Sequence, residues 1–299
     1  LNVVFVLIDT VRASHLSLYG YQRQTSPRLD AWATSASIFD RAYAQAPNTP
    51  RSIPSMLTGR YPSRVRWNSL YANYSKPNAE QPNLFALFQS SGWRTEAVSS
   101  HWYFEKVPTI KTGIDRWDNS GFTDVKTSYT QKTSPDITAR AKQRLDTLVQ
   151  NDAPFFLFIH YFDPHSQYHK HDGFVDFEIR SAMDHYDSEL AYTDHHLAGL
   201  LDRLDAPDLR ENTLVVITSD HGEAFGEHGY DFHGRTLFEE EIRTPLIIRH
   251  PKIRANRIQS PVGLVDLFAT LSEAQGGVAQ IGDGYSLLPI MRREQAYRK

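Results

Sequence analysis

Carboxylate and imidazole side chains follow three apolar segments of the sequence, at the points where those segments end. They are Asp9 after residues 2–8, His165 after residues 154–162, and Asp220 with His221 after residues 212–219. Aspartate and histidine together are ligands for zinc, manganese and similar divalent ions. If the three segments are parallel strands of one sheet, their carboxyl ends share an edge, and the sequence predicts a metal site there.

Histidines are concentrated around these candidate ligands. Ten of the 13 histidines lie between His160 and His233, far more than an even spread along the chain would place there. His221 is favoured as a ligand, because a position directly after a buried strand otherwise favours an apolar residue. The histidines interpreted as solvent-facing or structural are His185, His195, His196 and His228.

Buried strands alternate with amphipathic helices along the chain. Residues 2–8 form an almost continuous apolar run, which is typical of a strand covered on both faces. The predicted strands are residues 2–8, 95–99, 154–159, 212–218 and 245–248. One helix is predicted to start after Ser26, and the others span residues 52–59, 84–89, 136–148, 183–204 and 265–274. This order predicts an α/β fold with a large, mostly parallel sheet sandwiched between helices.

Composition excludes several classes of protein. The 299 residues contain no cysteine, which excludes a disulfide framework, an iron–sulfur cluster and a cysteine nucleophile. Basic and acidic residues number 32 and 35, without a basic cluster, so nucleic-acid binding is not expected. No apolar run reaches the roughly 18–20 residues that cross a bilayer. Because the chain begins at Leu1 within a strand-like run, we expect a piece of a longer protein, and a membrane link through a missing segment stays open.

Eight sequence pieces, in order, resemble the sulfatase and alkaline-phosphatase superfamily. The pieces are NVVFVLIDTVRASHLSLYGY with TSPRLD, APNTPRSIPSMLTGRYPS, GWRTEAVSSHW, FFLFIHYFDPH, YDSELAYTD, TSDHGEAFGEHG, HGRTLFEEEIRTPLII, and VDLFATL with DGYSLLP. The resemblance covers almost the whole chain. It implies one sulfatase-like catalytic domain over residues 1–299, with the C-terminal subdomain of the family short or missing. It also implies an extracytoplasmic protein, periplasmic or attached to a membrane and facing outward.

The resemblance places the nucleophile at Thr49, counted back from residues 57–60 (LTGR). Many sulfatases have there a cysteine or serine that matures to formylglycine, and threonine lies outside that maturation route. The arginine of the family pattern, four residues later, is Ile53 here. Branches of the superfamily that transfer phosphoryl groups resemble this chain in using threonine. A register with Ser52 as the nucleophile, or a role for Thr49 as a helix cap, are the alternatives.

The metal site that the resemblance implies consists of Asp9, Thr49, Asp220 and His221. Sulfatases commonly have an acidic residue where this chain has Thr10, and an amide residue where it has His221. An imidazole ligand favours zinc or manganese, with calcium or magnesium as alternatives. Coordination to such an ion lowers the pKa of a hydroxyl, which would activate the threonine.

Three histidines are expected to act on the substrate. His165 matches a sulfatase histidine that contacts the ester, and His233 is placed to protonate the leaving oxygen. His101 stands before Trp102, where sulfatases often have lysine, and keeps a cation that depends on pH. Arg51 is a candidate replacement for the missing arginine. One metal is favoured over two, although a second set with suitable ligand types consists of Asp163, His165, His169 and His233.

These residues predict a metal-dependent hydrolase or transferase of sulfate or phosphate esters. Metal-bound Thr49 would attack in line and form a covalent intermediate, with phosphate esters favoured. The expected partner is an anionic ester, such as one on a glycan or a lipid head group. The alternatives are a true sulfuric ester hydrolase of the arylsulfatase type, a membrane-linked transferase of the phosphoethanolamine or glycerophosphate type, and a degenerate binding domain without activity.

Overall fold

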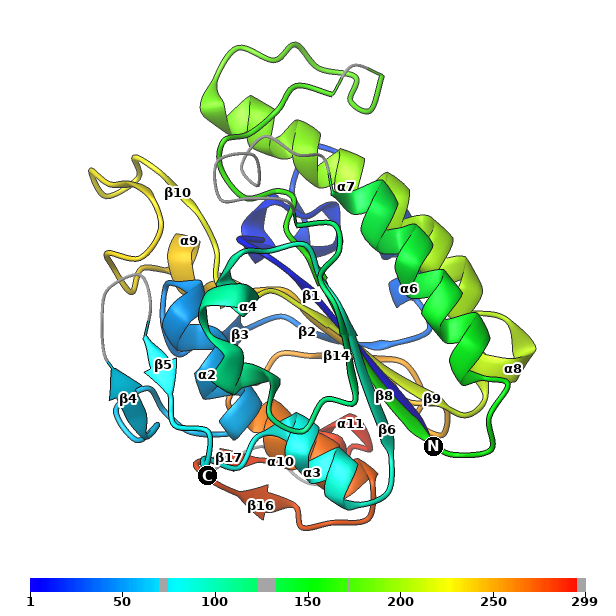
Figure 1. Cartoon of the computed structure of the whole chain (residues 1–299). Helices are drawn as coiled ribbons and strands as arrows, with labels where there is room; N and C mark the ends of the chain where they lie inside the picture. Colours follow the sequence, from blue (N-terminus) through cyan, green and yellow to red (C-terminus); the bar gives the residue numbers. More distant parts are fainter. Residues whose placement is uncertain (70–74, 123–132, 172, 295–299) are drawn as a thin grey trace.

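A sheet of eight strands forms the centre of the structure (Figure 1). The computed structural model describes residues 1–69, 75–122, 133–171 and 173–294. In sheet order the strands are β14 (Asn256–Ile258), β2 (Ser37–Phe39), β13 (Leu246–Arg249), β9 (Thr213–Thr218), β1 (Asn2–Ile8), β8 (Phe155–Tyr161), β6 (Arg94–Val98) and β7 (Arg116–Asp118). Every neighbouring pair is parallel except the two pairs that β13 makes. The predicted large and mostly parallel sheet is therefore confirmed.

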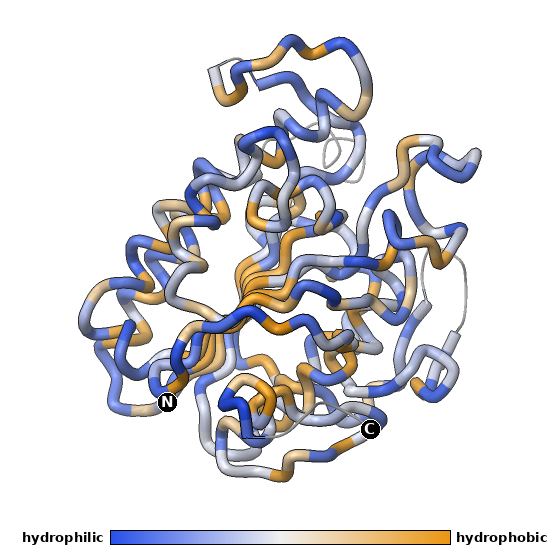
Figure 2. The backbone as a smooth tube through the Cα atoms, turned by 180° about the vertical axis from the view of Figure 1, so that it is seen from behind, coloured by the Kyte–Doolittle hydropathy of each residue, from blue (hydrophilic) through white to orange (hydrophobic). Residues whose placement is uncertain are grey.

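Both faces of the central strand β1 are covered, as its continuous apolar run predicts. Val3, Phe5 and Leu7 belong to one hydrophobic core. Val4 and Val6, which point the other way, belong to a second core. The central strands are accordingly apolar along their length in Figure 2. Since each face of β1 is closed by its own core, the polar side chains of this segment lie at its ends, Asn2 at the start and Asp9 directly after it.

Two layers of helices supply these cores (Figure 1). On one face lie α1 (Pro27–Ala33), α6 (Ser134–Leu148) and α7 (Ala182–Leu204). On the other lie α2 (Thr49–Thr58), α3 (Leu84–Ser90), α4 (Tyr103–Lys106), α10 (Asp266–Ala274) and α11 (Leu288–Met291). The sandwich of helices around a sheet is thus the predicted one.

Short elements complete the described chain. The helices are α8 (Pro207–Arg210) and α9 (Glu239–Ile242), with 3-10 turns at Ala13–His15, Ser17–Tyr19 and Pro108–Lys111. The strands are β3 (Ala42–Tyr43), β12 (Arg243–Thr244) and β15 (Val262–Gly263) in one small sheet, and the pairs β4 (Trp67–Ser69) with β5 (Lys76–Pro77), β10 (Ala224–Phe225) with β11 (Asp231–Phe232), and β16 (Gln280–Ile281) with β17 (Gly284–Tyr285). No helix within the described ranges is both long and apolar enough to cross a membrane.

Two helices begin earlier than their sequence patterns predicted. The helix α2 starts at Thr49 rather than at Ser52, because a proline such as Pro50 is tolerated in a first turn, where its missing N–H has no partner to lose. The helix α6 starts at Ser134 rather than at residue 136, again with a proline in its first turn. The earlier start of α2 matters for the site, since it makes Thr49 the first helical residue.

Candidate active site

Three adjacent strand ends bring the predicted metal ligands together. In the sheet β1 lies between β9 and β8, so Asp9 follows the middle strand and Asp220 follows its neighbour. His221 Nε2 lies 3.7 Å from Asp9 Oδ1 and 3.5 Å from Asp220 Oδ2. All three side chains are fully buried. The structure thus joins Asp9, Asp220 and His221 in the arrangement that the sequence predicted.

The hydrogen bonds of His221 fix which of its nitrogens is available. Nδ1 lies 3.0 Å from the carbonyl oxygen of Gly222, to which only a protonated nitrogen can donate. In the neutral ring, Nε2 therefore presents its lone pair toward the two carboxylates. Metal-binding histidines commonly have this arrangement, with the other N–H held by a carbonyl or carboxylate.

Three of the four carboxylate oxygens of this cluster lack hydrogen-bond partners in the described chain, and the fourth, Asp220 Oδ1, accepts from the His221 N–H at 3.1 Å. Both oxygens of Asp9 and the Oδ2 atom of Asp220 make no hydrogen bond within the described chain. Burial raises the pKa of Asp9 well above its ordinary range, and repulsion from Asp220 raises it further. Burial also raises the pKa of Asp220. Buried carboxylates without partners are costly unless a cation is bound to them. The donor set therefore fits a divalent metal ion.

Thr49 extends the cluster from the other side of the site. Its Oγ1 lies 3.1 Å from His221 Nε2, and the side chain is 5% exposed. The N-cap of α2 is Asn48, so the interpretation of Thr49 as a helix cap is wrong. In the competing register, the hydroxyl of Ser52 donates instead to the carbonyl oxygen of Asp220 at 2.5 Å. Thr49 is the one of the two whose hydroxyl faces the cluster.

His233 comes from the loop after β11 and is paired with a buried acid. Its Nδ1 lies 2.9 Å from Oε1 of Glu223, and its ring centre lies 4.4 Å from that of His221. Burial opposes protonation of this ring, but the Glu223 carboxylate outweighs it and raises the pKa of His233. A protonated histidine at this place can donate a proton toward the cluster.

His165 and His101 lie on the β8 and β6 side of the cluster. The ring of His165 is 5.1 Å from that of His233 and 6.2 Å from that of His101. Burial lowers the pKa of His165. Burial and repulsion from His160 lower the pKa of His101 well below its ordinary value. This lowering favours the neutral form of the His101 ring, whose Nδ1 lies 4.0 Å from Asp9 Oδ2.

A strained turn after β1 aims Asp9 into the site. Thr10 has φ 57°, the left-handed region that a β-branched residue seldom adopts, at a cost of about 1–3 kcal/mol. The Tyr186 hydroxyl of α7 donates to the Thr10 carbonyl oxygen at 2.8 Å and accepts from the Arg12 N–H at 3.0 Å. The Ser219 hydroxyl accepts from the Val11 N–H at 2.8 Å. These bonds hold the turn in its strained form.

Asp163 is not available as a metal ligand. Its carboxylate accepts hydrogen bonds from the backbone and hydroxyl groups of both Thr133 and Ser134, and so binds the start of α6. The second metal set considered from the sequence, with Asp163, is therefore wrong. The physical reason is that a helix N-terminus competes for the same oxygens.

Three residues of the site were missed by sequence reasoning. His160 lies in β8 with its Nε2 3.4 Å from Asp9 Oδ2, and Glu223 and Tyr186 have the contacts given above. A histidine inside an otherwise apolar strand, at a position on the same face as Phe156 and Phe158, is a signal that could have found His160. Nothing local marks Glu223 or Tyr186, because their partners are distant in sequence.

The histidines predicted to be structural have contacts outside the cluster. His228 pairs with Glu240 through Nδ1 and stacks on Phe238 with ring centres 3.7 Å apart. His195 and His196 lie on α7, next to Phe174. The structure therefore places these three histidines as the sequence predicted.

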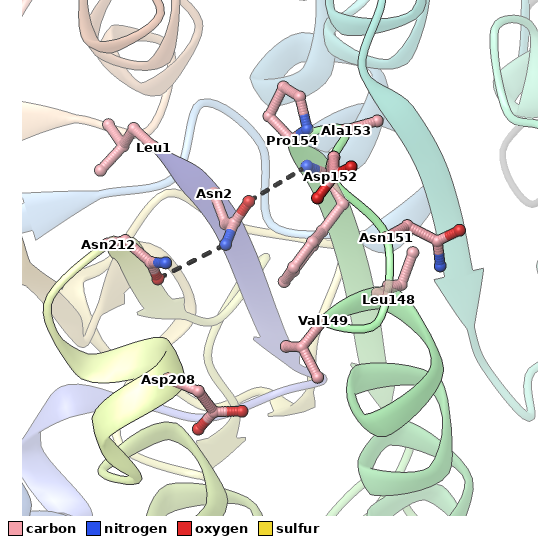
Figure 3. A pocket seen from close by; sticks show the side chains of 11 residues that line it. Leu1, Asn2, Leu148, Val149, Asn151, Asp152, Ala153, Pro154, Asp208 and Asn212 are labelled. Carbon is pink, nitrogen blue, oxygen red and sulfur yellow. Dashed lines mark hydrogen bonds between the residues drawn. The ribbon is translucent and has the colours of Figure 1, made fainter.

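A pocket lies at the opposite, amino-terminal end of the strands (Figure 3). Its volume is about 330 Å³, and its lining includes Asn2 of β1, Leu148 of α6 and Asn212. Asn2 bridges the neighbouring strands by accepting from the Phe155 N–H at 3.3 Å. None of the described residues that line this pocket is a histidine, so they do not share the chemistry of the cluster at the other end.

The chain is similar to known proteins along most of its length. A family model described as Sulfatase matches residues 1–277. An ulvan-active sulfatase from Formosa agariphila is 26% identical over 316 residues, which cover 90% of this chain and 60% of that protein. The chain thus spans less than two thirds of this relative.

Two solved structures share the fold. The phosphonate monoester hydrolase of Agrobacterium radiobacter superposes with a TM-score of 0.76 at 17% identity, over 98% of this chain and 77% of that one. The C-terminal periplasmic domain of EcEptC from Escherichia coli, solved in complex with Zn, has a TM-score of 0.70 at 18% identity, over 91% and 81% of the two chains. At these identities the likeness concerns the fold alone.

Proposed function

The chain belongs to the sulfatase family, and on this premise we propose that it is a metal-dependent enzyme that cleaves or transfers anionic esters, with Thr49 as the nucleophile. Phosphate esters are the preferred substrates in this proposal. The observation that carries it is the 3.1 Å contact between Thr49 Oγ1 and His221 Nε2. This hydroxyl lies next to a histidine that faces the buried Asp9 and Asp220, three of whose carboxylate oxygens have no hydrogen-bond partner in the described chain.

Asp9, Asp220, His221 and Thr49 would hold the divalent ion. The imidazole favours zinc or manganese over calcium or magnesium, and a structural neighbour solved with Zn supports the same choice. Such an ion lowers the pKa of a nearby hydroxyl and offsets the charge of an anionic ester. The protein contributes rigidity, since the three strand-end ligands are fully buried and Thr49 nearly so.

His233 and His165 have different roles in the proposed reaction. Thr49 Oγ1 releases its proton to solvent and attacks the phosphorus in line, and the bond to the leaving oxygen breaks. His233, kept protonated by Glu223, donates its proton to that oxygen. An anionic ester next to His165 would favour the protonated ring, which can then donate to a non-bridging oxygen. Water or an acceptor alcohol afterwards attacks the phosphothreonine and restores the free hydroxyl.

The identity of the nucleophile favours phosphate over sulfate esters. A threonine ester has one oxygen on its side-chain carbon, so its release requires a second attack on the phosphorus or sulfur. A formylglycine hydrate has two hydroxyl groups on that carbon and can expel the bound group by breaking the carbon–oxygen bond instead. Because displacement at phosphorus is common enzyme chemistry, threonine suits phosphate.

A sulfuric ester hydrolase is the second candidate. It is favoured by the sulfatase family model and by the relative named as an ulvan-active sulfatase. If this candidate holds, an ester on a glycan is the natural substrate class to test. A membrane-linked transferase differs only in its acceptor and would use the same cluster.

A turnover panel tests the proposal. It compares an aryl phosphate monoester, an aryl phosphate diester and an aryl sulfate, each with added zinc, manganese or calcium, for the wild type and the variants Thr49→Ala, Thr49→Ser and Ser52→Ala. We expect phosphate turnover that falls by about 10³-fold or more in Thr49→Ala and survives in part in Thr49→Ser. Mass spectrometry of acid-quenched enzyme should find a phosphoryl group on the peptide with Thr49.

Three outcomes would contradict the proposal. Full activity in Thr49→Ala removes Thr49 from the mechanism. Loss of activity in Ser52→Ala, with Thr49→Ala active, moves the nucleophile to the other register. Sulfate turnover without phosphate turnover in the wild type supports the second candidate instead.

A further inference from the structure

A second group of potential metal ligands shares Asp9 with the first. His160 Nε2 lies 3.4 Å from Asp9 Oδ2, and His101 Nδ1 lies 4.0 Å from the same oxygen. The three ligand atoms lie within 4.8 Å of one another. His221, by contrast, faces the other oxygen, Asp9 Oδ1. The two carboxylate oxygens of Asp9 are therefore directed at different sets of histidines.

A single cation cannot satisfy both groups. A cation held by Asp9, Asp220 and His221 uses the Oδ1 side of Asp9. It leaves Asp9 Oδ2 and the ring nitrogens of His101 and His160 as they are, buried and without hydrogen-bond partners within the described chain. Each buried polar atom left in this state costs about 1–3 kcal/mol. Such a concentration of unpaired atoms around one point indicates a missing ligand.

We propose that Asp9, His101 and His160 bind a second divalent cation, and that the Asp9 carboxylate bridges the two metal positions. This inference rests on the proposed function only in that Asp9 also serves the first cation. The site differs from the second set considered from the sequence, because it uses neither Asp163 nor His165. It draws instead on β8, on the turn after β1 and on the segment after β6.

The spacing and protonation of the group suit a zinc-like ion. Bonds of about 2.0–2.1 Å in a tetrahedral site put ligand atoms about 3.4 Å apart, close to the 3.4 Å and 4.0 Å found here. A metal needs neutral imidazoles, and burial lowers the pKa of His160 to about 4. Two imidazoles and one carboxylate form a donor set that zinc or manganese accepts more readily than calcium.

Aromatic side chains hold the two histidines in place. The ring of His101 stacks on Phe162 with centres 4.3 Å apart, and the ring of His160 meets the edge of Phe104 at 5.0 Å. Both histidines are nearly or fully buried. Packing of this kind restricts their rotation and prepares the site before a cation arrives.

A second cation would complete the charge balance of the site when a doubly charged ester is bound. One divalent ion balances the charges of Asp9 and Asp220, and protonated His233 balances Glu223. An ester with two negative charges would then bring charge that these groups do not offset. A second cation would offset the charge of the ester. Such a site favours phosphate monoesters, which carry two negative charges, over sulfate monoesters, which carry one.

Zinc stoichiometry tests the proposal directly. The full chain is stripped with a chelator and titrated with zinc alone, in the presence of a chromophoric chelator that removes weakly bound surface ions. We expect two zinc ions in the wild type and one in His160→Ala. The matched control His195→Ala, on the exposed side of α7, should keep two. Asp220→Asn should keep one, because it weakens only the first site.

The zinc counts distinguish failure of the second site from failure of both sites. One zinc ion in the wild type, unchanged by His160→Ala, overturns the second site and leaves the first standing. No zinc in the wild type overturns both. Anomalous diffraction at the zinc edge needs no variant and should show two peaks, one beside each oxygen of Asp9. A single peak beside His221 would refute the second site even if His160→Ala failed to fold.

Discussion

Glu223 contributes most to the acid strength of His233, ahead of the smaller effects of Asp9 and Asp220. Glu223 is fully buried, lies 2.9 Å from the imidazole Nδ1 and raises the pKa of His233 above its ordinary value. Only the protonated ring can give a proton to a leaving oxygen. The rate of a reaction that uses His233 as the acid therefore falls as the pH rises through this pKa.

Replacing Glu223 should shift the alkaline limb of the pH profile, the range in which the rate falls as His233 loses its proton. In Glu223→Gln the carboxylate that favours the charged ring is gone, so the pKa of His233 falls and the alkaline limb of kcat/KM shifts to lower pH. At the pH optimum of the wild type, we expect kcat to fall by about 10²-fold or more. The measurement is kcat/KM against pH for the aryl phosphate.

A matched pair elsewhere in the chain provides the control. His228 and Glu240 form a similar histidine–carboxylate contact, outside the cluster. Glu240→Gln should leave the pH profile in place. An alkaline limb that stays fixed in Glu223→Gln would remove His233 from the role of acid.

The residues of the first proposed metal site could be predicted from sequence, and so could Asp9 and His101 of the second, but His160 could not. Asp9, Asp220 and His221 directly follow apolar runs, and the sequence alone shows this adjacency. His160 lies within such a run, where an apolar pattern conceals a single polar residue. Asp9, the partner of His160, is 151 positions away in sequence. The pairing of Leu7 with His160 between β1 and β8 brings the two residues together.

At the level of elements, the turn after β1 is coupled to the long helix α7. The Tyr186 hydroxyl makes two hydrogen bonds to the backbone of this turn, one to the carbonyl oxygen of Thr10 and one to the N–H of Arg12. These bonds hold Thr10 in its left-handed conformation. The position of Asp9 therefore depends on a helix that contributes no ligand.

Removal of the Tyr186 hydroxyl should be costly for stability. Tyr186→Phe leaves a buried N–H and a buried carbonyl without their partner, which we expect to lower the free energy of unfolding by about 1–3 kcal/mol. The control is Tyr103→Phe, because the Tyr103 hydroxyl is equally buried but makes no hydrogen bond within the described chain. Urea unfolding of both variants, at saturating zinc, measures the difference. Equal costs for the two would mean that the turn is held by other contacts.

Strand and helix positions were predictable where burial alone determines them. Continuous apolar runs identified β1, β8 and β9, and helical spacing identified α6 and α7. The reversed direction of β13 was not predictable, since an apolar run has the same pattern in either direction. The start of α2 at Thr49 was also not predictable from its apolar spacing, which begins after Pro50, although a first turn accepts proline.

At the scale of the whole molecule, the proposed metal binding would be linked to folding stability. Asp9 and Asp220 are buried, close together and without hydrogen bonds to their facing oxygens. A cation that binds the folded chain and not the unfolded chain stabilises it by mass action, by about 4 kcal/mol at a thousand times Kd. The metal-free protein should therefore be markedly less stable.

Chelation should lower the Tm, and the effect should grow with pH. The pKa values of Asp9 and Asp220 are raised in the folded state, so the metal-free fold is penalised more as the pH rises and these carboxyls must lose their protons. A cation competes with those protons. The gain in Tm on adding zinc should thus be larger at about pH 8 than at about pH 6, by calorimetry.

The control for this experiment is Asp220→Asn, which should gain less from zinc. A Tm that does not respond to chelation, in protein shown to lose its metal, would contradict the link. The physical basis of this link is that the fold buries acidic groups, whose burial destabilises it unless a cation is bound.

The central place of β1 has a consequence for biosynthesis. Asn2 and Asn212, beside the paired ends of β1 and β9, are 210 residues apart. A ribosome that adds about 5–20 residues per second therefore leaves β1 without this neighbour for roughly 10–40 s. During that interval an apolar strand with an open edge is exposed to other nascent chains. We expect the yield of folded enzyme to depend on whatever shields β1 until β9 has left the ribosome.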